Sequence, residues 1–190
     1  MKTHLIIVGA ILATNACSSA KPYAANVVAN DYYLCCNLRF NHDGDATDAN
    51  YAYSGGGVLA AGSRVTVTKA GQSYVYLSPV GEQQKYYLEL RFGTQQQSPA
   101  QYFAAILRDT DPRESLETWS SDVQDAVRNG RLAPGMTKEQ VLMARGYPPY
   151  HRTPGGVESD EWLYYDTRAR TTRIRFEDGK LVNLQSLPAP

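Results

Sequence analysis

Residues 134–141 have the sequence Pro134-Gly135-Met136-Thr137-Lys138-Glu139-Gln140-Val141, and this stretch decides the fold because it encodes the start of a helix. The Thr137 hydroxyl can accept a hydrogen bond from the first turn, and Gln140 can reach back to complete a capping box. Gly146 can take the left-handed conformation that stops a helix, and the two prolines that follow it prevent the helix from resuming.

Two further segments follow this helix and predict an antiparallel sheet. Residues 161–165, with the sequence EWLYY, are rich in aromatic residues and favour a strand. Residues 172–182 alternate apolar and polar side chains around Asp178-Gly179, which is a strong signal for a two-residue turn. We therefore expect a strand followed by a hairpin.

The order of these parts resembles the SmpA/OmlA family, the BamE-like small lipoproteins of the Gram-negative outer membrane. Its signature is a Gly-Met-Thr-Lys-x-x-Val helix start, a Gly-x-Pro stop, a Trp-x-Tyr strand and a final hairpin. The matching positions are Gly135, Met136, Thr137, Lys138, Val141, Gly146, Pro148, Trp162, Tyr164, Phe176 and Gly179. Arg145 departs from the pattern, since an aliphatic residue usually precedes the glycine. The resemblance covers roughly the last third of the chain, and it implies two helices on a three-stranded antiparallel sheet.

The N-terminus indicates export. Residues 1–16 combine Lys2 with a short apolar run, which is typical of a secretory signal peptide. Cys17 follows Ala16 as in a lipobox, so we expect its lipidation and an outer-membrane anchor facing the periplasm. The alternative is ordinary cleavage after Ala16 or Ala20, which would leave a soluble periplasmic or secreted protein. Residues 17–29 are mostly small or polar and predict a tether.

The rest of the chain predicts an α+β protein. Residues 30–95 show period-two alternation with glycine-containing turns, which indicates a small antiparallel β barrel or sheet, faintly similar to SH3-like modules. Within it we expect one strand over residues 32–40. Residues 96–190 predict a helix capped by Ser98, a second helix capped by Asp111 and then the BamE-like α+β region.

The vicinal pair Cys35-Cys36 is the most reactive feature of the sequence. Adjacent side chains of a strand point to opposite faces and are poorly placed to bond each other, so we expect one buried and one half-exposed thiol. A vicinal disulfide and an intermolecular bridge are the alternatives. A nucleophilic role would need a base, and neither His42 nor His151 stands in a recognisable catalytic context.

Other patterns do not predict catalysis, a metal or a cofactor. Residues 43–48 have calcium-loop spacing for two carboxylates but lack the closing glutamate, so a solvated turn is expected. Residues 54–57 lack the lysine and helix of a phosphate-binding loop. The 19 basic and 19 acidic residues balance, which gives no indication of nucleic-acid binding, and the 14 tyrosines are assigned to sheet packing.

Four arginines on and before the last hairpin are the candidate binding residues. They are Arg168, Arg170, Arg173 and Arg175. They could form a solvated sheet face, or they could contact an anionic headgroup or an acidic partner near a membrane.

The sequence thus predicts a non-catalytic envelope lipoprotein that acts as a scaffold or binding module for envelope proteins, with the outer-membrane barrel assembly machinery as the expected partner. Two alternatives stay open. One is a peptidoglycan-binding protein that uses its SH3-like region. The other is an inhibitor or sensor, because proteinaceous β-lactamase inhibitors have a similar layout.

Overall fold

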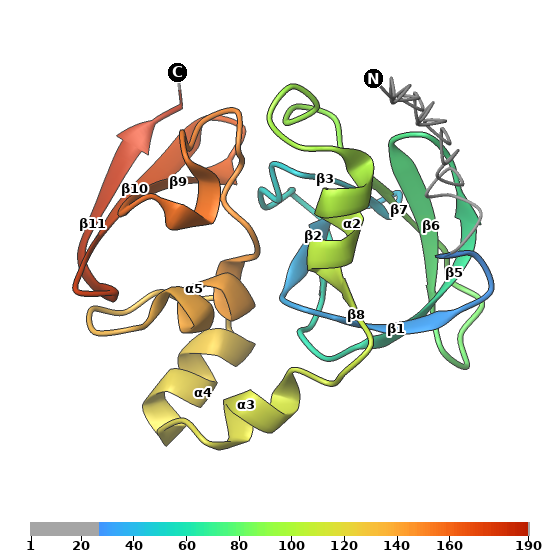
Figure 1. Ribbon diagram of the computed structural model, residues 1–190, viewed down its shortest axis with the longest axis horizontal. Helices are drawn as coiled ribbons and strands as arrows, with labels where there is room; N and C mark the ends of the chain where they lie inside the picture. The colour runs from blue at the N-terminus through green and yellow to red at the C-terminus, as the bar shows by residue number, and fades with distance from the viewer. Residues whose placement is uncertain (1–26, 190) are drawn as a thin grey trace, which may run out of the picture.

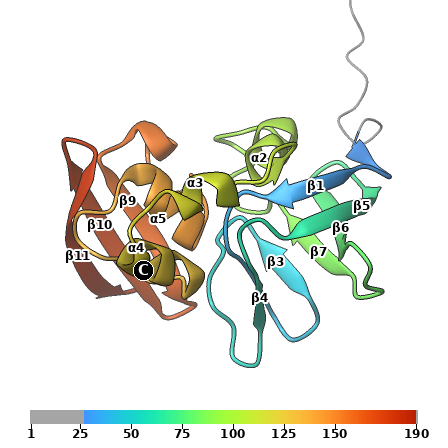
Figure 2. The same ribbon diagram turned by 90° about the horizontal axis from the view of Figure 1, so that it is seen from below.

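The computed structural model describes residues 27–189, which form two halves lying side by side (Figures 1 and 2). The N-terminal half, residues 27–110, contains a curled six-stranded sheet and helix α2 (Pro99–Ile106). The C-terminal half, residues 111–189, contains helices and a three-stranded antiparallel sheet. The protein is therefore of the mixed α+β class. The expected leader and Cys17 lie outside the described residues.

The large sheet has the strand order β3-β7-β6-β5-β1-β8. Its strands are β1 (Asp31–Leu34), β3 (Asp45–Thr47), β5 (Arg64–Ala70), β6 (Tyr74–Pro79), β7 (Tyr86–Glu89) and β8 (Leu107–Arg108). The pairs are antiparallel except for β3 with β7, which is parallel. A separate pair joins β2 (Leu38–Phe40) to β4 (Gly57–Leu59). The expectation of an antiparallel sheet is thus correct for all but one edge of the large sheet.

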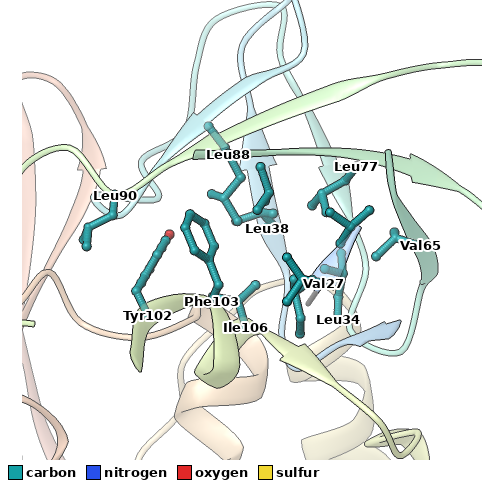
Figure 3. Packing of buried hydrophobic residues seen from close by; sticks show 14 of the residues in the cluster. Val27, Leu34, Leu38, Val65, Leu77, Leu88, Leu90, Tyr102, Phe103 and Ile106 are labelled. Carbon is teal, nitrogen blue, oxygen red and sulfur yellow. The ribbon is translucent and has the colours of Figure 1, made fainter. Parts of the chain in front are cut away.

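Alternation along the strands builds the first core. Val65, Val67, Val75 and Leu77 are fully buried because every second side chain of β5 and β6 points to the same face. Helix α2 covers that face with Tyr102, Phe103 and Ile106, which point toward Leu38 and Leu88 in Figure 3.

The last residues of the expected tether already belong to this half. Val27 is only 8% exposed and packs in the first core. The Ala29 N–H donates to the Val67 carbonyl at 2.8 Å. A free tether therefore cannot extend as far as residue 29.

The single strand expected over residues 32–40 is wrong. The chain forms β1, bends at residues 35–36 and resumes as β2, which pairs with a different strand. Cys35 and Cys36 are joined by a disulfide, so the expectation of two free thiols is also wrong. The small ring that this bond closes fixes the backbone of the two residues, which cannot then continue the extended strand.

Helix α2 begins as expected. The Ser98 hydroxyl accepts a hydrogen bond from the Gln101 N–H, and the Gln101 side-chain oxygen accepts one from the Ser98 N–H. Pro99 occupies the first turn.

The next expected helix is divided into two. The structure has α3 (Arg113–Glu117) and α4 (Ser121–Arg128), separated by Ser120, whose backbone is extended. The Gln124 side chain donates to the Trp119 carbonyl at 2.9 Å and so stabilises the break. The N-cap of α3 is Pro112 rather than the expected Asp111, although the Asp111 carboxylate, one residue earlier, accepts a hydrogen bond from the Arg113 N–H at 3.0 Å and pairs with the Arg113 guanidinium.

Helix α5 (Lys138–Arg145) has the predicted capping box, with Thr137 and Gln140 bonded to each other's backbone N–H. It ends at Gly146, whose φ of 78° is positive as predicted. Its buried residues include Val141 and Ala144. This agreement follows from the local nature of capping signals.

The C-terminal sheet has the order β11-β10-β9. Its strands are β9 (Glu161–Thr167), β10 (Arg170–Glu177) and β11 (Lys180–Pro188), and a short 3₁₀ helix, η1 (Gly156–Glu158), precedes them. Asp178 and Gly179 both have positive φ, at 49° and 71°, which confirms the predicted turn. One face of the sheet packs against the helices through Trp162, Ile174 and Phe176.

We predict that Thr137→Ala lowers the free energy of unfolding by about 1 kcal/mol, because the substitution removes the hydroxyl that accepts from the Gln140 N–H. Thr137→Ser keeps that acceptor and should retain most of the stability. Chemical denaturation of the two variants measures the difference. Equal losses in the two variants would show that the methyl group of Thr137, rather than its hydroxyl, matters.

Candidate functional site

A buried asparagine joins the two halves. The Asn37 side chain is 3% exposed and donates to the Val127 carbonyl at 2.7 Å and the Ala144 carbonyl at 3.1 Å. Its side-chain oxygen accepts from the Ala61 N–H at 3.0 Å, and its own backbone N–H donates to the Met143 carbonyl at 3.0 Å. Residues of the N-terminal half thereby satisfy carbonyls near the C-terminal ends of α4 and α5, where a helix leaves acceptors free.

A second buried asparagine extends this junction. The Asn50 side chain donates to the Asn37 carbonyl at 3.1 Å and the Arg145 carbonyl at 2.8 Å, and it accepts from the Arg39 N–H at 2.8 Å. A Cβ atom on Gly146 would lie 2.7 Å from the Asn50 nitrogen. Gly146 is thus required both for its positive φ and for the close approach of the two halves.

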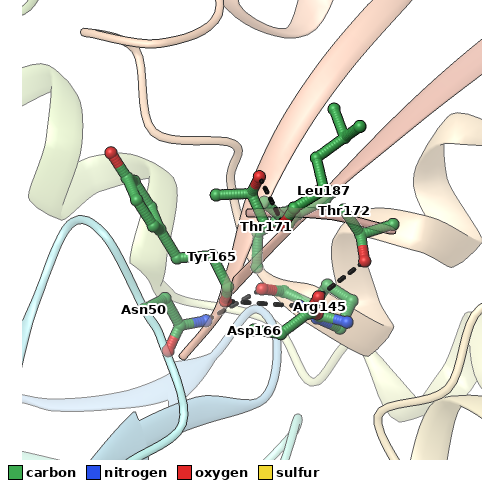
Figure 4. Close-up of polar contacts among 9 residues, drawn as sticks. Asn50, Arg145, Tyr165, Asp166, Thr171, Thr172 and Leu187 are labelled. Atoms are coloured by element: carbon green, nitrogen blue, oxygen red, sulfur yellow. Dashed lines mark hydrogen bonds and ion pairs between the residues drawn. The ribbon is translucent and has the colours of Figure 1, made fainter. Parts of the chain in front are cut away.

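Arg145, which departs from the SmpA/OmlA pattern, has a defined place in this junction. It is 8% exposed, and its guanidinium pairs with the Asp166 carboxylate at 2.8 Å (Figure 4). The other carboxylate oxygen accepts from the Thr172 hydroxyl at 2.6 Å. The guanidinium also lies 5.3 Å from the centroid of the Tyr164 ring. The Arg39 guanidinium is also partly buried near this site. Its burial and then the charge of Arg145 lower the pKa of Arg39 to about 10.

Five rings form a surface strip that crosses the same junction. We call Tyr53, Tyr51, Tyr165, His151 and Phe92 the aromatic strip. Successive ring centroids are 4.6, 6.2, 6.1 and 5.3 Å apart. A guanidinium lies over each end region, because Arg168 is 5.9 Å from the Tyr51 ring and Arg91 is 5.6 Å from the Phe92 ring. Burial lowers the pKa of His151, which favours the neutral imidazole within the strip.

A pocket of about 430 Å³ lies at the Tyr53 end of the aromatic strip. It is lined by Asn41, His42, Ala52, Tyr53, Ser54, Thr167, Arg168 and Ala169. The Ala52 N–H donates to the Asp166 carbonyl at 3.0 Å and holds the loop of the N-terminal half against the C-terminal sheet. Burial and a side-chain hydrogen bond with Tyr51 raise the pKa of Tyr53, so this phenol stays protonated. The pocket can therefore stack on a planar group, donate hydrogen bonds and attract an anion.

The four candidate arginines do not share one site. Arg168 lines the junction pocket, whereas Arg173 lines a separate pocket of about 400 Å³ beside Trp162. Arg175 pairs with Glu177 at 2.9 Å on the outer face of the sheet, and Arg170 is exposed at the start of β10. Of these four arginines, Arg168 is therefore the one that lies where the two halves meet.

A second group of rings lies on the outer face of the large sheet. The tyrosine face consists of Tyr74, Tyr76 and Tyr87, whose centroids are 5.2 to 5.8 Å apart. The Lys69 ammonium lies 5.9 and 5.6 Å from the centroids of Tyr74 and Tyr76. These rings are half-buried by one another and leave one side open to solvent.

Residues 43–48 do not form the expected solvated turn throughout, since Asp45–Thr47 form β3 and Asp48 has a structural role. Asp48 is buried, and its carboxylate accepts from the backbone N–H groups of Arg91, Phe92 and Gly93 at 2.7 to 3.0 Å. Within residues 27–189, no group of three or more His, Cys, Asp or Glu side chains is arranged to bind a metal ion. Over the same residues, no helix has the length and apolar character needed to cross a membrane.

Comparisons with protein-family models, with curated proteins and with solved structures found no match.

Sequence reasoning found Arg168 but not the residues that join the halves. Asn37 lies beside the cysteine pair, and Asn50 ends a polar loop, where asparagine normally signals only a turn. The positive φ of Asn50, 44°, fits that local reading. No pattern in the nearby sequence predicts the partners of Asn37 and Asn50 in the C-terminal half, because those partners are 90 or more residues away in the chain.

We predict that Asp166→Asn lowers the free energy of unfolding by about 2–3 kcal/mol, because it leaves the buried Arg145 guanidinium without its counter-charge. Arg145→Leu should cost less, since it removes that buried charge and leaves Asp166 in its more exposed position. Urea denaturation of both single variants and of the double variant gives the coupling energy. A coupling near zero would contradict this account of the junction.

Proposed function

We propose that this protein is a non-catalytic binding module of the Gram-negative outer-membrane envelope, anchored through lipid on Cys17 and facing the periplasm. The observation that carries the proposal is the pocket built from both halves, with Arg168 and Tyr53 in its lining. Because residues of both halves line the pocket, binding there depends on how the two halves pack together. Such a pocket suits a module that binds another molecule at its surface.

The SmpA/OmlA resemblance supports the envelope setting. Helices α4 and α5 pack with a three-stranded antiparallel sheet, and the segments on which the resemblance rests include the Thr137 capping box and the Asp178-Gly179 turn. We propose on this basis that the C-terminal half has the BamE-like layout. The N-terminal half then supplies the loop residues that complete the pocket.

We propose a protein of the barrel assembly machinery as the partner, bound through an acidic or aromatic side chain. A carboxylate would pair with the exposed Arg168, and a ring would stack on the aromatic strip. Arg168 and Tyr53 both line the pocket and are at least partly exposed, so a partner can reach them without opening the junction.

We predict that crosslinking in envelopes followed by detergent extraction recovers barrel assembly proteins with this protein. Arg168→Glu should lower that recovery about tenfold, because it places a like charge against the acidic group of the partner. Arg131→Glu, at an exposed arginine that follows α4, is the matched control and should leave recovery unchanged. Recovery of no barrel assembly protein, or equal recovery with both variants, would contradict the proposal.

A second candidate function is peptidoglycan binding, which the tyrosine face favours. Its three rings and Lys69 form a platform on a sheet, and tyrosine combines a rigid apolar ring with a hydroxyl that can bond to a sugar. On this reading, the N-terminal half would contact the cell wall.

We predict in that case that the protein sediments with purified peptidoglycan and that the double variant Tyr76→Ala/Tyr87→Ala binds about tenfold more weakly. Tyr33→Ala, on β1 outside the tyrosine face, is the matched control. Sedimentation that is absent, or that is unaffected by the double variant, removes this candidate.

A further inference from the structure

The Cys35–Cys36 disulfide lies between the first core and the junction of the halves. Cys36 is 1% exposed and packs in the first core. Cys35 is half-buried and lines a small pocket of about 120 Å³ with Arg108 and Glu139, among others. The Cys35 side of the disulfide therefore faces a pocket that a thiol in solution can enter, whereas Cys36 is enclosed in the first core.

The residue that follows the pair is Asn37, which joins the halves. Its backbone N–H and its side chain bond to the carbonyls of Met143, Val127 and Ala144. On the other side of the bond, the Cys35 N–H donates to the Ile106 carbonyl at 2.9 Å. The disulfide thus fixes the backbone between a bond to the N-terminal half and several bonds to the C-terminal half.

The sequence itself favours a different backbone at this point. Leu34, Cys36, Leu38 and Phe40 alternate as in one continuous strand, and all four are buried. The structure instead divides the segment into β1 and β2 at the disulfide. Without the bond, the chain gains access to the extended conformation, which moves Asn37 away from its partners.

We propose that the Cys35–Cys36 bond is a thiol–disulfide exchange site for a dithiol reductant, and that its reduction loosens the junction between the halves. The evidence is the accessible Cys35 beside a buried Cys36, together with the position of Asn37. The exposed Arg108 lines the same pocket, where its positive charge offsets the negative charge of Glu139 and so reduces the repulsion of an incoming thiolate.

The exchange balances as two displacements. A thiolate of the reductant attacks the Cys35 sulfur, the Cys35–Cys36 bond breaks, and the Cys36 thiolate leaves and takes up a proton. The second thiol of the reductant then loses its proton and attacks the reductant sulfur that is bonded to Cys35. This displaces Cys35 as a thiolate, which takes up a proton. The protein gains two electrons and two protons, and the dithiol becomes a disulfide.

The junction pocket depends on the same packing. It is lined by loops of both halves, and the Ala52 N–H bond to Asp166 holds them together. Reduction at Cys35–Cys36 therefore acts on a binding surface that neither cysteine touches. This inference stands whether or not the bound partner is the one proposed above.

The first measurement is the mass of the Cys35–Cys36 peptide after the purified full-length protein, treated with or without dithiothreitol, is alkylated in denaturant so that the buried Cys36 can also react. We expect alkylation of both cysteines only after reduction. Alkylation of both before reduction would overturn the proposal, because it would show two free thiols.

The second measurement is hydrogen exchange of the oxidised and reduced protein. We expect the backbone N–H groups of Asn37, Arg39 and Ala52 to exchange about tenfold faster or more after reduction. The Leu181 N–H, which bonds to the Met136 carbonyl within the C-terminal half, should be unchanged. Unchanged exchange at all four positions, or equal acceleration at all four, would overturn the proposal.

A variant provides the matched control. Cys35→Ser/Cys36→Ser should show the fast exchange of the reduced protein with or without dithiothreitol. The slow pattern of the oxidised protein in this variant would overturn the proposal. Because the first two measurements use the native chain, they do not depend on the folding of the variant.

Discussion

The structure depends on the hydrogen bonds that Asn37 makes across the two halves. A buried amide costs free energy unless each of its groups has a partner, and Asn37 finds these partners at the ends of two helices and in a neighbouring loop. Such bonds are directional, so they fix the relative position of the halves in a way that apolar packing alone does not. Asn50 and the Arg145–Asp166 pair extend the same constraint to the C-terminal sheet.

The C-terminal half could be predicted well from its sequence, because its signals are local. The Thr137 capping box, the positive φ at Gly146 and the Asp178-Gly179 turn each involve residues close in the chain. The breaks in two expected elements could not be predicted in this way. A covalent bond divides the strand at residues 35–36, and the break between α3 and α4 depends on the Gln124 side chain.

The candidate site shows the same division between local and long-range signals. Arginine near a hairpin is a visible pattern, and Arg168 does line the pocket. The sequence analysis did not detect the aromatic strip, because its five rings come from four separate regions of the chain and its tyrosines were assigned to sheet packing. In the sequence Arg145 is recognisable only as a departure from a motif. Its role in the junction could not be predicted, because that role depends on Asp166, which is 21 residues away in the chain.

The sequence distance between Asn37 and its partners has a consequence for the order of folding. Its side chain meets carbonyls that are 90 and 107 residues later in the chain. As the chain emerges from its N-terminus, the large sheet also lacks its last strand, β8, until residue 108 has appeared. The β9–β10–β11 sheet, by contrast, joins neighbours in sequence and can form without waiting for distant segments. During synthesis the N-terminal half is complete first, but its Asn37 side chain stays hydrated until α4 and α5 have emerged and packed against it.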